Sequence, residues 1–138
     1  MKQISVLGAT GSIGQNTLDL IKSTKDEFEV VALTGSQNIK LLAQSAIDSN
    51  AKIVATSDDS KFNELKEILS GRNIKVLGGK NGILEASSAK VDWVMSAIVG
   101  SAGLLPGLTA MQAGANVALA NKESMVAAGP IMKKVSQE

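Results

Sequence analysis

The chain has 138 residues, enough for one domain that buries about two-thirds of the surface its unfolded form exposes. Its net charge of +1 indicates neither a nucleic acid nor an anionic membrane as a partner. It contains no cysteine, histidine or tyrosine, which excludes disulfides, a thiol nucleophile and the commonest general base. No apolar run approaches the ~20 residues of a membrane-spanning helix, and we expect a soluble, intracellular protein.

A glycine-rich turn follows the first expected strand. The strand is expected at residues 3–7, with an apolar run at residues 4–7. Residues 8–14 read GATGSIG, and residues 12–23 carry apolar side chains at helical spacing. A strand, a glycine turn and a helix amino terminus predict a phosphate-binding loop, because free N–H groups and the helix dipole attract an anion. The spacing is G-x-x-G-x-x-G instead of the commoner G-x-G-x-x-G, and a tight turn without a ligand is the alternative.

The second expected strand, residues 30–33, ends in polar residues before a helix at residues 39–49. No carboxylate stands there to bind the ribose 2′-hydroxyl that distinguishes NAD. Ser36, Asn38 and the backbone at Gly35 can donate hydrogen bonds, and Lys40 follows closely. The pattern favours NADP over NAD, although Asn38 by itself is also typical of a helix cap.

Three further strands are expected at residues 52–56, 74–77 and 93–97, with helices at residues 60–69 and 81–89 between them. Small residues and glycines follow the third of these strands, before a helix at residues 104–113. Such a loop lets a flat ring approach the backbone closely. A close-packed turn with no ligand is the alternative.

The last expected strand, residues 117–120, leads into Asn121, Lys122 and Glu123 and a helix at residues 123–135. Asn121 can cap this helix, and Glu123 is favourable in its first turn because the helix dipole is positive there. Lys122 opposes the dipole, which indicates an anionic ligand beside it. A solvated surface lysine is the alternative.

Six strand and helix repeats predict an α/β fold, namely a Rossmann-like doubly wound parallel sheet in a three-layer αβα arrangement with right-handed crossovers. Ligands of open α/β sheets bind beyond the carboxyl ends of the strands. We therefore expect the glycine turn, the loop after residue 97 and the turn at Asn121 to face one crevice.

Three motifs together resemble the 1-deoxy-D-xylulose 5-phosphate reductoisomerase family: LGATGSIG at residues 7–14, SAIVGSAGLLPGL at residues 96–108 and LANKES at residues 119–124. The resemblance runs the length of the chain. It implies an enzyme that rearranges 1-deoxy-D-xylulose 5-phosphate and reduces it with NADPH to 2-C-methyl-D-erythritol 4-phosphate, for isoprenoid precursor synthesis. It also implies a divalent metal, Mg²⁺ or Mn²⁺, and a homodimer in the bacterial cytoplasm or the plastid.

The resemblance assigns roles to individual residues. Those implied to contact NADPH are Thr10, Gly11, Ser12, Ile13, Gly35, Ser36, Asn38, Asn121 and Glu123. Lys122 would touch the sugar-phosphate substrate, and Ala97 and Ile98 would lie near the nicotinamide. Gln37 stands where many family members have a basic residue, which would loosen the hold on the 2′-phosphate.

Full-length family members continue into a catalytic and a C-terminal domain, and the resemblance places their metal ligands and a mobile substrate-covering loop after Glu138. We expect residues 1–138 to be one NADPH-binding Rossmann domain, without catalytic or metal-binding residues of its own. Such a domain is expected to bind the cofactor but not to turn over substrate.

Other protein classes share parts of these motifs. Extended short-chain dehydrogenases use the same glycine spacing but need a tyrosine, which this chain lacks. Aspartate-semialdehyde dehydrogenase shares the GATG turn and homoserine dehydrogenase an Ala-Asn-Lys turn, yet neither combines LANKES with SAIVGSAGLLPGL. From a different class, a non-catalytic nucleotide-sensing Rossmann module remains an alternative.

Overall fold

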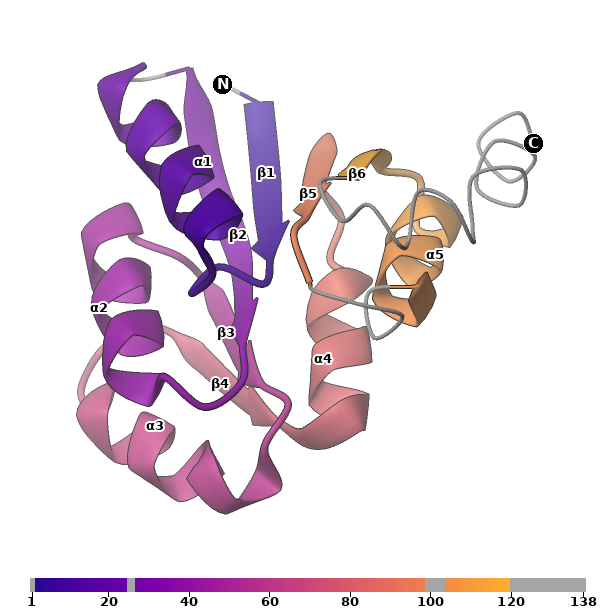
Figure 1. Ribbon diagram of the computed structural model, residues 1–138. Coiled ribbons are helices and arrows are strands. Elements are labelled where there is room, and N and C mark those ends of the chain that lie inside the picture. Colours follow the sequence, from indigo (N-terminus) through magenta and orange to yellow (C-terminus); the bar gives the residue numbers. More distant parts are fainter. Residues whose placement is uncertain (1, 25–26, 99–103, 120–138) are drawn as a thin grey trace.

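The computed structural model describes residues 2–24, 27–98 and 104–119. Six parallel strands form one sheet in the order β4-β3-β2-β1-β5-β6 (Figure 1). The strands are β1 (Lys2–Leu7), β2 (Phe28–Gly35), β3 (Ile53–Thr56), β4 (Lys75–Gly78), β5 (Trp93–Ser96) and β6 (Asn116–Leu119). The strand order runs outward from β1 to β4, and the chain then returns to place β5 on the other side of β1. The strand order therefore reverses between β1 and β5, while all strands stay parallel.

Helices cover both faces of the sheet (Figure 1). On one face lie α1 (Ser12–Ser23), α2 (Ile39–Ser49) and α3 (Phe62–Ile68), the last preceded by a 3₁₀ turn, η1 (Asp59–Lys61). On the other face lie α4 (Gly79–Ser87) and α5 (Leu104–Gln112). This arrangement confirms the predicted Rossmann-like, doubly wound, three-layer fold.

The predicted elements agree with the observed ones to within a few residues, and α1 and α2 have the predicted bounds. The third helix begins with a 3₁₀ turn because the Asp58 carboxylate accepts the N–H of Ser60 at 3.0 Å and its hydroxyl at 2.6 Å. Helix α4 starts earlier than predicted, because Gly79 has a φ of +77° and turns the chain directly out of β4. The helix predicted at residues 123–135 lies outside the described residues.

The larger hydrophobic core lies between the sheet and α1–α3. It joins Val6 and Val54 of the strands to Leu42 and Leu65 of the helices, all fully buried. The opposite face is lined by smaller side chains such as Ala32 and Ala55, which lets α4 pack closely through Ala86. Burying one valine or leucine side chain contributes about 1.5–3 kcal/mol, so this core holds the strand ends in fixed positions.

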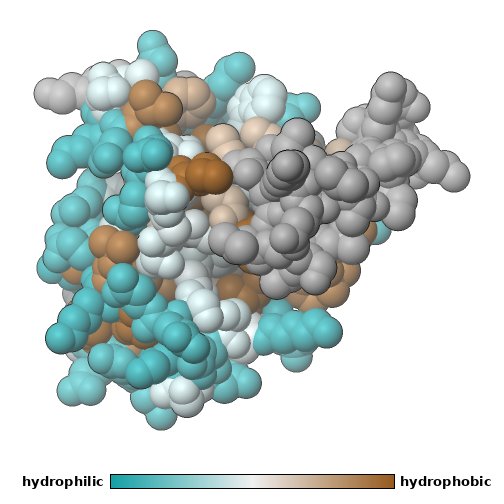
Figure 2. Space-filling model, viewed as in Figure 1, coloured by the Kyte–Doolittle hydropathy of each residue, from teal (hydrophilic) through white to brown (hydrophobic). Residues whose placement is uncertain are grey.

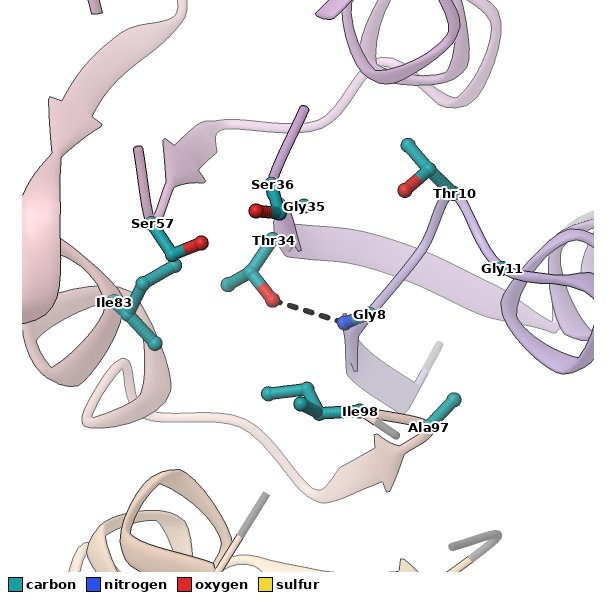
Figure 3. A pocket seen from close by; sticks show the side chains of 10 residues that line it. All are labelled: Gly8, Thr10, Gly11, Thr34, Gly35, Ser36, Ser57, Ile83, Ala97 and Ile98. Atoms are coloured by element: carbon teal, nitrogen blue, oxygen red, sulfur yellow. Dashed lines mark hydrogen bonds between the residues drawn. The ribbon is translucent and has the colours of Figure 1, made fainter. Parts of the chain in front are cut away.

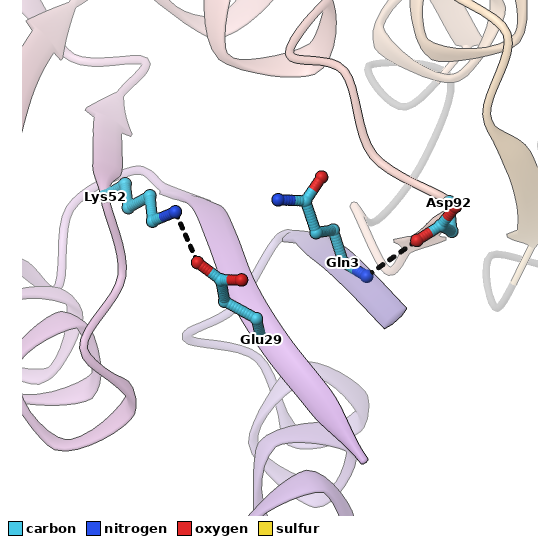
Figure 4. Close-up of polar contacts among 4 residues, drawn as sticks. All are labelled: Gln3, Glu29, Lys52 and Asp92. Carbon is cyan, nitrogen blue, oxygen red and sulfur yellow. Dashed lines mark hydrogen bonds and ion pairs between the residues drawn. The ribbon is translucent and has the colours of Figure 1, made fainter. Parts of the chain in front are cut away.

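Polar contacts tie the strands together at their amino ends (Figure 4). The Gln3 N–H donates to the Asp92 carboxylate at 2.8 Å, and Lys52 pairs with Glu29. The hydrogen bond and charge of Lys52 lower the pKa of Glu29, so the pair stabilises the fold above the ordinary glutamate pKa and is lost as pH falls through the lowered value. Lys52 is exposed and Glu29 is partly exposed, and ion pairs so accessible to water contribute little.

The outer surfaces of α1, α2 and α3, on the left of Figure 2, are mostly hydrophilic. Among the described residues no helix is long and apolar enough to cross a membrane.

Candidate nucleotide-binding site

A cavity of about 410 Å³ opens at the carboxyl ends of the strands, where the strand order reverses between β1 and β5 (Figure 3). Four strand ends and one helix contribute to it: its lining is Gly8, Thr10, Gly11, Thr34, Gly35, Ser36, Ser57, Ile83, Ala97 and Ile98. Ligands of open α/β sheets bind at this kind of switch point. The position of the cavity at this switch point therefore makes it the candidate binding site.

The three glycines of the loop are glycines for different structural reasons, and at two of them a side chain would collide with backbone atoms. Gly8 has a φ of +79°, and a Cβ there would lie 2.7 Å from the carbonyl oxygen of Ala97, so this glycine lets the β1 and β5 loops touch. A Cβ on Gly14 would overlap the carbonyl oxygen of Gly8 and lie 2.7 Å from Cα of Ala9. This glycine lets α1 pack against the turn.

The packing of the described residues does not require a glycine at position 11. The nearest atom to a Cβ there would be the Gly8 oxygen at 3.8 Å, and its φ of −78° suits any residue. Gly11 also lines the cavity. The absence of a side chain at this position leaves room that a bound molecule can fill.

The amino terminus of α1 adds the positive end of a helix dipole to the cavity, and no described side chain caps it. Its N-cap, Gly11, has no side chain to accept the first N–H groups, and its first turn carries no acidic residue. The N–H groups of Ser12 and Ile13 are thus available to an anion. Ser12 is exposed, as is Ile13 at 45%, so water or a ligand reaches this turn freely.

Thr34, at the end of β2, holds the glycine loop in place. Its buried hydroxyl accepts the N–H of Gly8 at 2.9 Å (Figure 3), and its carbonyl accepts the N–H of Ala9 at 2.7 Å. Sequence reasoning missed Thr34. A polar residue at the end of an otherwise apolar strand was the available signal.

At the β2 end of the cavity, Gly35 and Ser36 lie next to Ser57, which follows β3. The Ser36 and Ser57 hydroxyls point toward one another (Figure 3). No carboxylate is among the described residues that line the cavity. Sequence reasoning missed Ser57, as it did Ile83 of α4, which forms the apolar wall at this end.

Asn38 is the N-cap of α2, where its Oδ1 accepts the N–H of Leu41 at 3.3 Å. It is exposed and lies just beyond the cavity lining, and its side-chain NH₂ remains available as a donor. The capping role that the sequence left open for Asn38 is therefore confirmed. Its predicted role toward the cofactor stays a prediction.

Ala97 and Ile98 form the opposite end of the cavity, beyond β5. The Ala97 N–H donates to the Leu7 carbonyl at 2.8 Å, which fixes this end against β1. Asn121, Lys122 and Glu123 lie outside the described residues. Seven of the ten predicted site residues are described. Thr10, Gly11, Gly35 and Ser36 line the cavity, Ser12 and Ile13 follow Gly11 in the first turn of α1, and Asn38 caps α2.

The sequence profile of one protein family, described as 1-deoxy-D-xylulose 5-phosphate reductoisomerase, matches residues 4–129. Curated proteins of that name include one from Ruegeria sp., 47% identical over 138 residues, which cover 100% of this chain and 35% of the relative. Another, from Allorhizobium ampelinum, is 48% identical over 132 residues, which cover 94% of this chain and 33% of the relative. The chain thus spans about a third of the length of the curated relatives it matches.

Solved structures of the same enzyme superpose closely. The Zymomonas mobilis reductoisomerase in complex with NADPH aligns with a TM-score of 0.93 at 46% identity, over 99% of this chain and 36% of that one. A reductoisomerase in complex with NADPH, fosmidomycin and magnesium aligns with a TM-score of 0.92 at 36% identity, over 99% of this chain and 34% of that one. The alternative dehydrogenase and sensor assignments are not favoured. The chain belongs to the 1-deoxy-D-xylulose 5-phosphate reductoisomerase family.

Proposed function

We propose that this chain is the NADPH-binding domain of a 1-deoxy-D-xylulose 5-phosphate reductoisomerase. The observation that carries the proposal is the cavity at the switch point, where Gly11 leaves space that the fold does not need and α1 presents N–H groups without a cap. A diphosphate fits both features, because it brings negative charge to the helix terminus and needs close approach to the backbone.

The proposed orientation of NADPH follows the order of the strands. The diphosphate lies against Thr10–Ile13, and the adenosine with its 2′-phosphate extends toward Ser36 and Ser57. The nicotinamide extends toward Ala97 and Ile98, whose small or apolar side chains leave a flat ring dry and accessible. Bound there, NADPH supplies a hydride, and the chain's role is to fix the ring at the mouth of the crevice.

Further parts of the proposal concern the full-length protein. Asn121 and Glu123 contact NADPH, and Lys122 provides the positive charge for the sugar-phosphate substrate. Within the described residues no three acidic, histidine or cysteine side chains converge, so these residues do not fit a metal and we assign them no metal-dependent step. We also propose a homodimer, acting in the cytoplasm on 1-deoxy-D-xylulose 5-phosphate.

Residues 1–138 should bind NADPH more tightly than NADH, by about tenfold. The reason is that no carboxylate repels the 2′-phosphate in the described lining, while the Ser36 and Ser57 hydroxyls can donate to it; hydrogen bonds to charged groups contribute about 1.5–3 kcal/mol. Titration by nucleotide fluorescence measures both dissociation constants. Equal or tighter binding of NADH would show that Ser36 and Ser57 do not recognise the 2′-phosphate of NADPH.

Residues 1–138 alone should show no reductoisomerase activity with Mg²⁺ or Mn²⁺, although they bind NADPH. The proposal places the metal-binding acids in the remainder of the full-length protein. The assay follows NADPH oxidation with the sugar phosphate, and the full-length protein is the positive control. Metal-dependent oxidation of NADPH by a preparation free of full-length enzyme would contradict the proposal that the metal-binding acids lie outside residues 1–138.

A further inference from the structure

Two backbone carbonyls beside the cavity are each held by a side-chain donor that is not part of the cavity lining. The Gln15 amide donates to the carbonyl oxygen of Ala9 at 2.8 Å. The Thr56 hydroxyl donates to the carbonyl oxygen of Ser36 at 2.7 Å. The first contact lies in the glycine loop, next to the proposed position of the diphosphate. The second lies after β2, next to the proposed position of the 2′-phosphate.

These contacts also set the direction of the next N–H group. The structure contains no cis peptide among its described residues, and in a trans peptide the C=O and the following N–H point in opposite directions. The Ala9 carbonyl turns toward Gln15, so the Thr10 N–H turns away from it. In the same way, Thr56 directs the N–H of Gln37. Neither N–H donates a hydrogen bond within the described part of the chain.

The two donors are themselves fixed. Gln15, in α1, also donates to the Ser45 hydroxyl of α2 at 3.0 Å, so its amide is held between the glycine loop and α2. Thr56 is fully buried, and its hydroxyl also accepts the Asp58 N–H at 3.2 Å. Because the anchors cannot rotate freely, the peptides they hold are oriented before any ligand arrives.

We propose that Gln15 and Thr56 are positioning residues for the two separate phosphate sites of NADPH. Gln15 aims the Thr10 N–H at the diphosphate, and Thr56 aims the Gln37 N–H at the 2′-phosphate. The proposal rests on the proposed function and adds to it that separate residues orient the binding groups for the two phosphate sites. It also gives the uncharged Gln37 a role, because its backbone, and not its side chain, binds the phosphate.

The two residues predict opposite selectivity. NADH carries the diphosphate without the 2′-phosphate, whereas adenosine 2′-phosphate carries the 2′-phosphate without the diphosphate. Gln15→Met should raise the dissociation constants of NADPH and NADH by about fivefold each and leave adenosine 2′-phosphate unchanged. Thr56→Val should raise those of NADPH and adenosine 2′-phosphate by about fivefold and leave NADH unchanged. Thr56→Ser, which keeps the hydroxyl, should restore the wild-type values.

The experiment uses fluorescence titration for the dinucleotides and NMR titration for adenosine 2′-phosphate. Thr109→Val is the matched control. Among the described residues the Thr109 hydroxyl donates only to the Leu105 carbonyl within α5, so its loss should affect no ligand. Thermal unfolding establishes that each variant is folded. If Thr56→Val does not fold, Thr56→Ala, which also lacks the hydroxyl, takes its place with the same expected selectivity.

Loss of all three ligands in equal measure in either variant would overturn the inference, because it would indicate general damage to the loops. Unchanged affinities in both variants would overturn it as well. These outcomes are read against a wild-type chain that binds NADPH. A wild-type chain that binds neither dinucleotide would instead contradict the proposed function itself, and the inference with it.

Discussion

Gly11→Val should abolish detectable NADPH binding, with a dissociation constant raised at least about a hundredfold, while the protein stays folded. The valine methyl groups would occupy the space beside the α1 amino terminus, where the nearest protein atom to a Cβ is 3.8 Å away. A hundredfold loss corresponds to about 2.8 kcal/mol of binding free energy. Fluorescence titration measures the affinity.

Thermal unfolding of the same variant separates binding from folding. The backbone at Gly11 is extended, with φ −78° and ψ 171°, which a β-branched residue adopts without strain. Replacing an N-cap glycine costs about 1 kcal/mol at most, so the unfolding temperature should fall only slightly. The control Thr17→Val alters α1 outside the cavity lining and should change affinity by less than about threefold. Wild-type affinity in Gly11→Val would mean that the loop has only a structural role.

The fold could be predicted from the sequence because its signals are local. Charge-free apolar runs marked the centres of the strands, and residues such as Asn38 and Gly11 stand directly before α2 and α1. The glycine loop was predictable for the same reason, since three glycines within seven residues are a local pattern. Only the start of α4, at Gly79, depended on a backbone conformation that the pattern does not reveal.

The missed site residues depend on topology. Thr34 reaches Gly8 across 26 residues of sequence because β2 pairs with β1. Ser57 lines the cavity because β3 pairs with β2. Ile83 lines it because α4 packs against the face of the sheet formed by Ala32 and Ala55. No spacing within the sequence records these neighbours. Gln15 and Thr56 could not be predicted for a further reason. They donate to backbone carbonyls, which every residue possesses, so the identity of the accepting residue gives no signal in the sequence.

Gly14→Ala should destabilise the fold by about 2–3 kcal/mol, in contrast to substitutions at Gly11. The added methyl group would overlap the Gly8 carbonyl oxygen and lie 2.7 Å from Cα of Ala9. These are backbone atoms, and the same turn is fastened to Thr34 by two hydrogen bonds, so it cannot yield without losing them. Alanine's better helix propensity offsets about 1 kcal/mol of the cost.

Urea unfolding measures this change in the free energy of unfolding, and Gly11→Ala is the matched control because it adds the same methyl group three residues earlier. The control should cost less than about 1 kcal/mol, since the nearest atom to its methyl group is the Gly8 oxygen at 3.8 Å, an ordinary van der Waals contact. A Gly14→Ala variant as stable as the control would show that α1 can shift away from the turn. The pair thus separates the glycine that the fold needs from the glycine that the cofactor needs, a distinction that the regular spacing of the motif conceals.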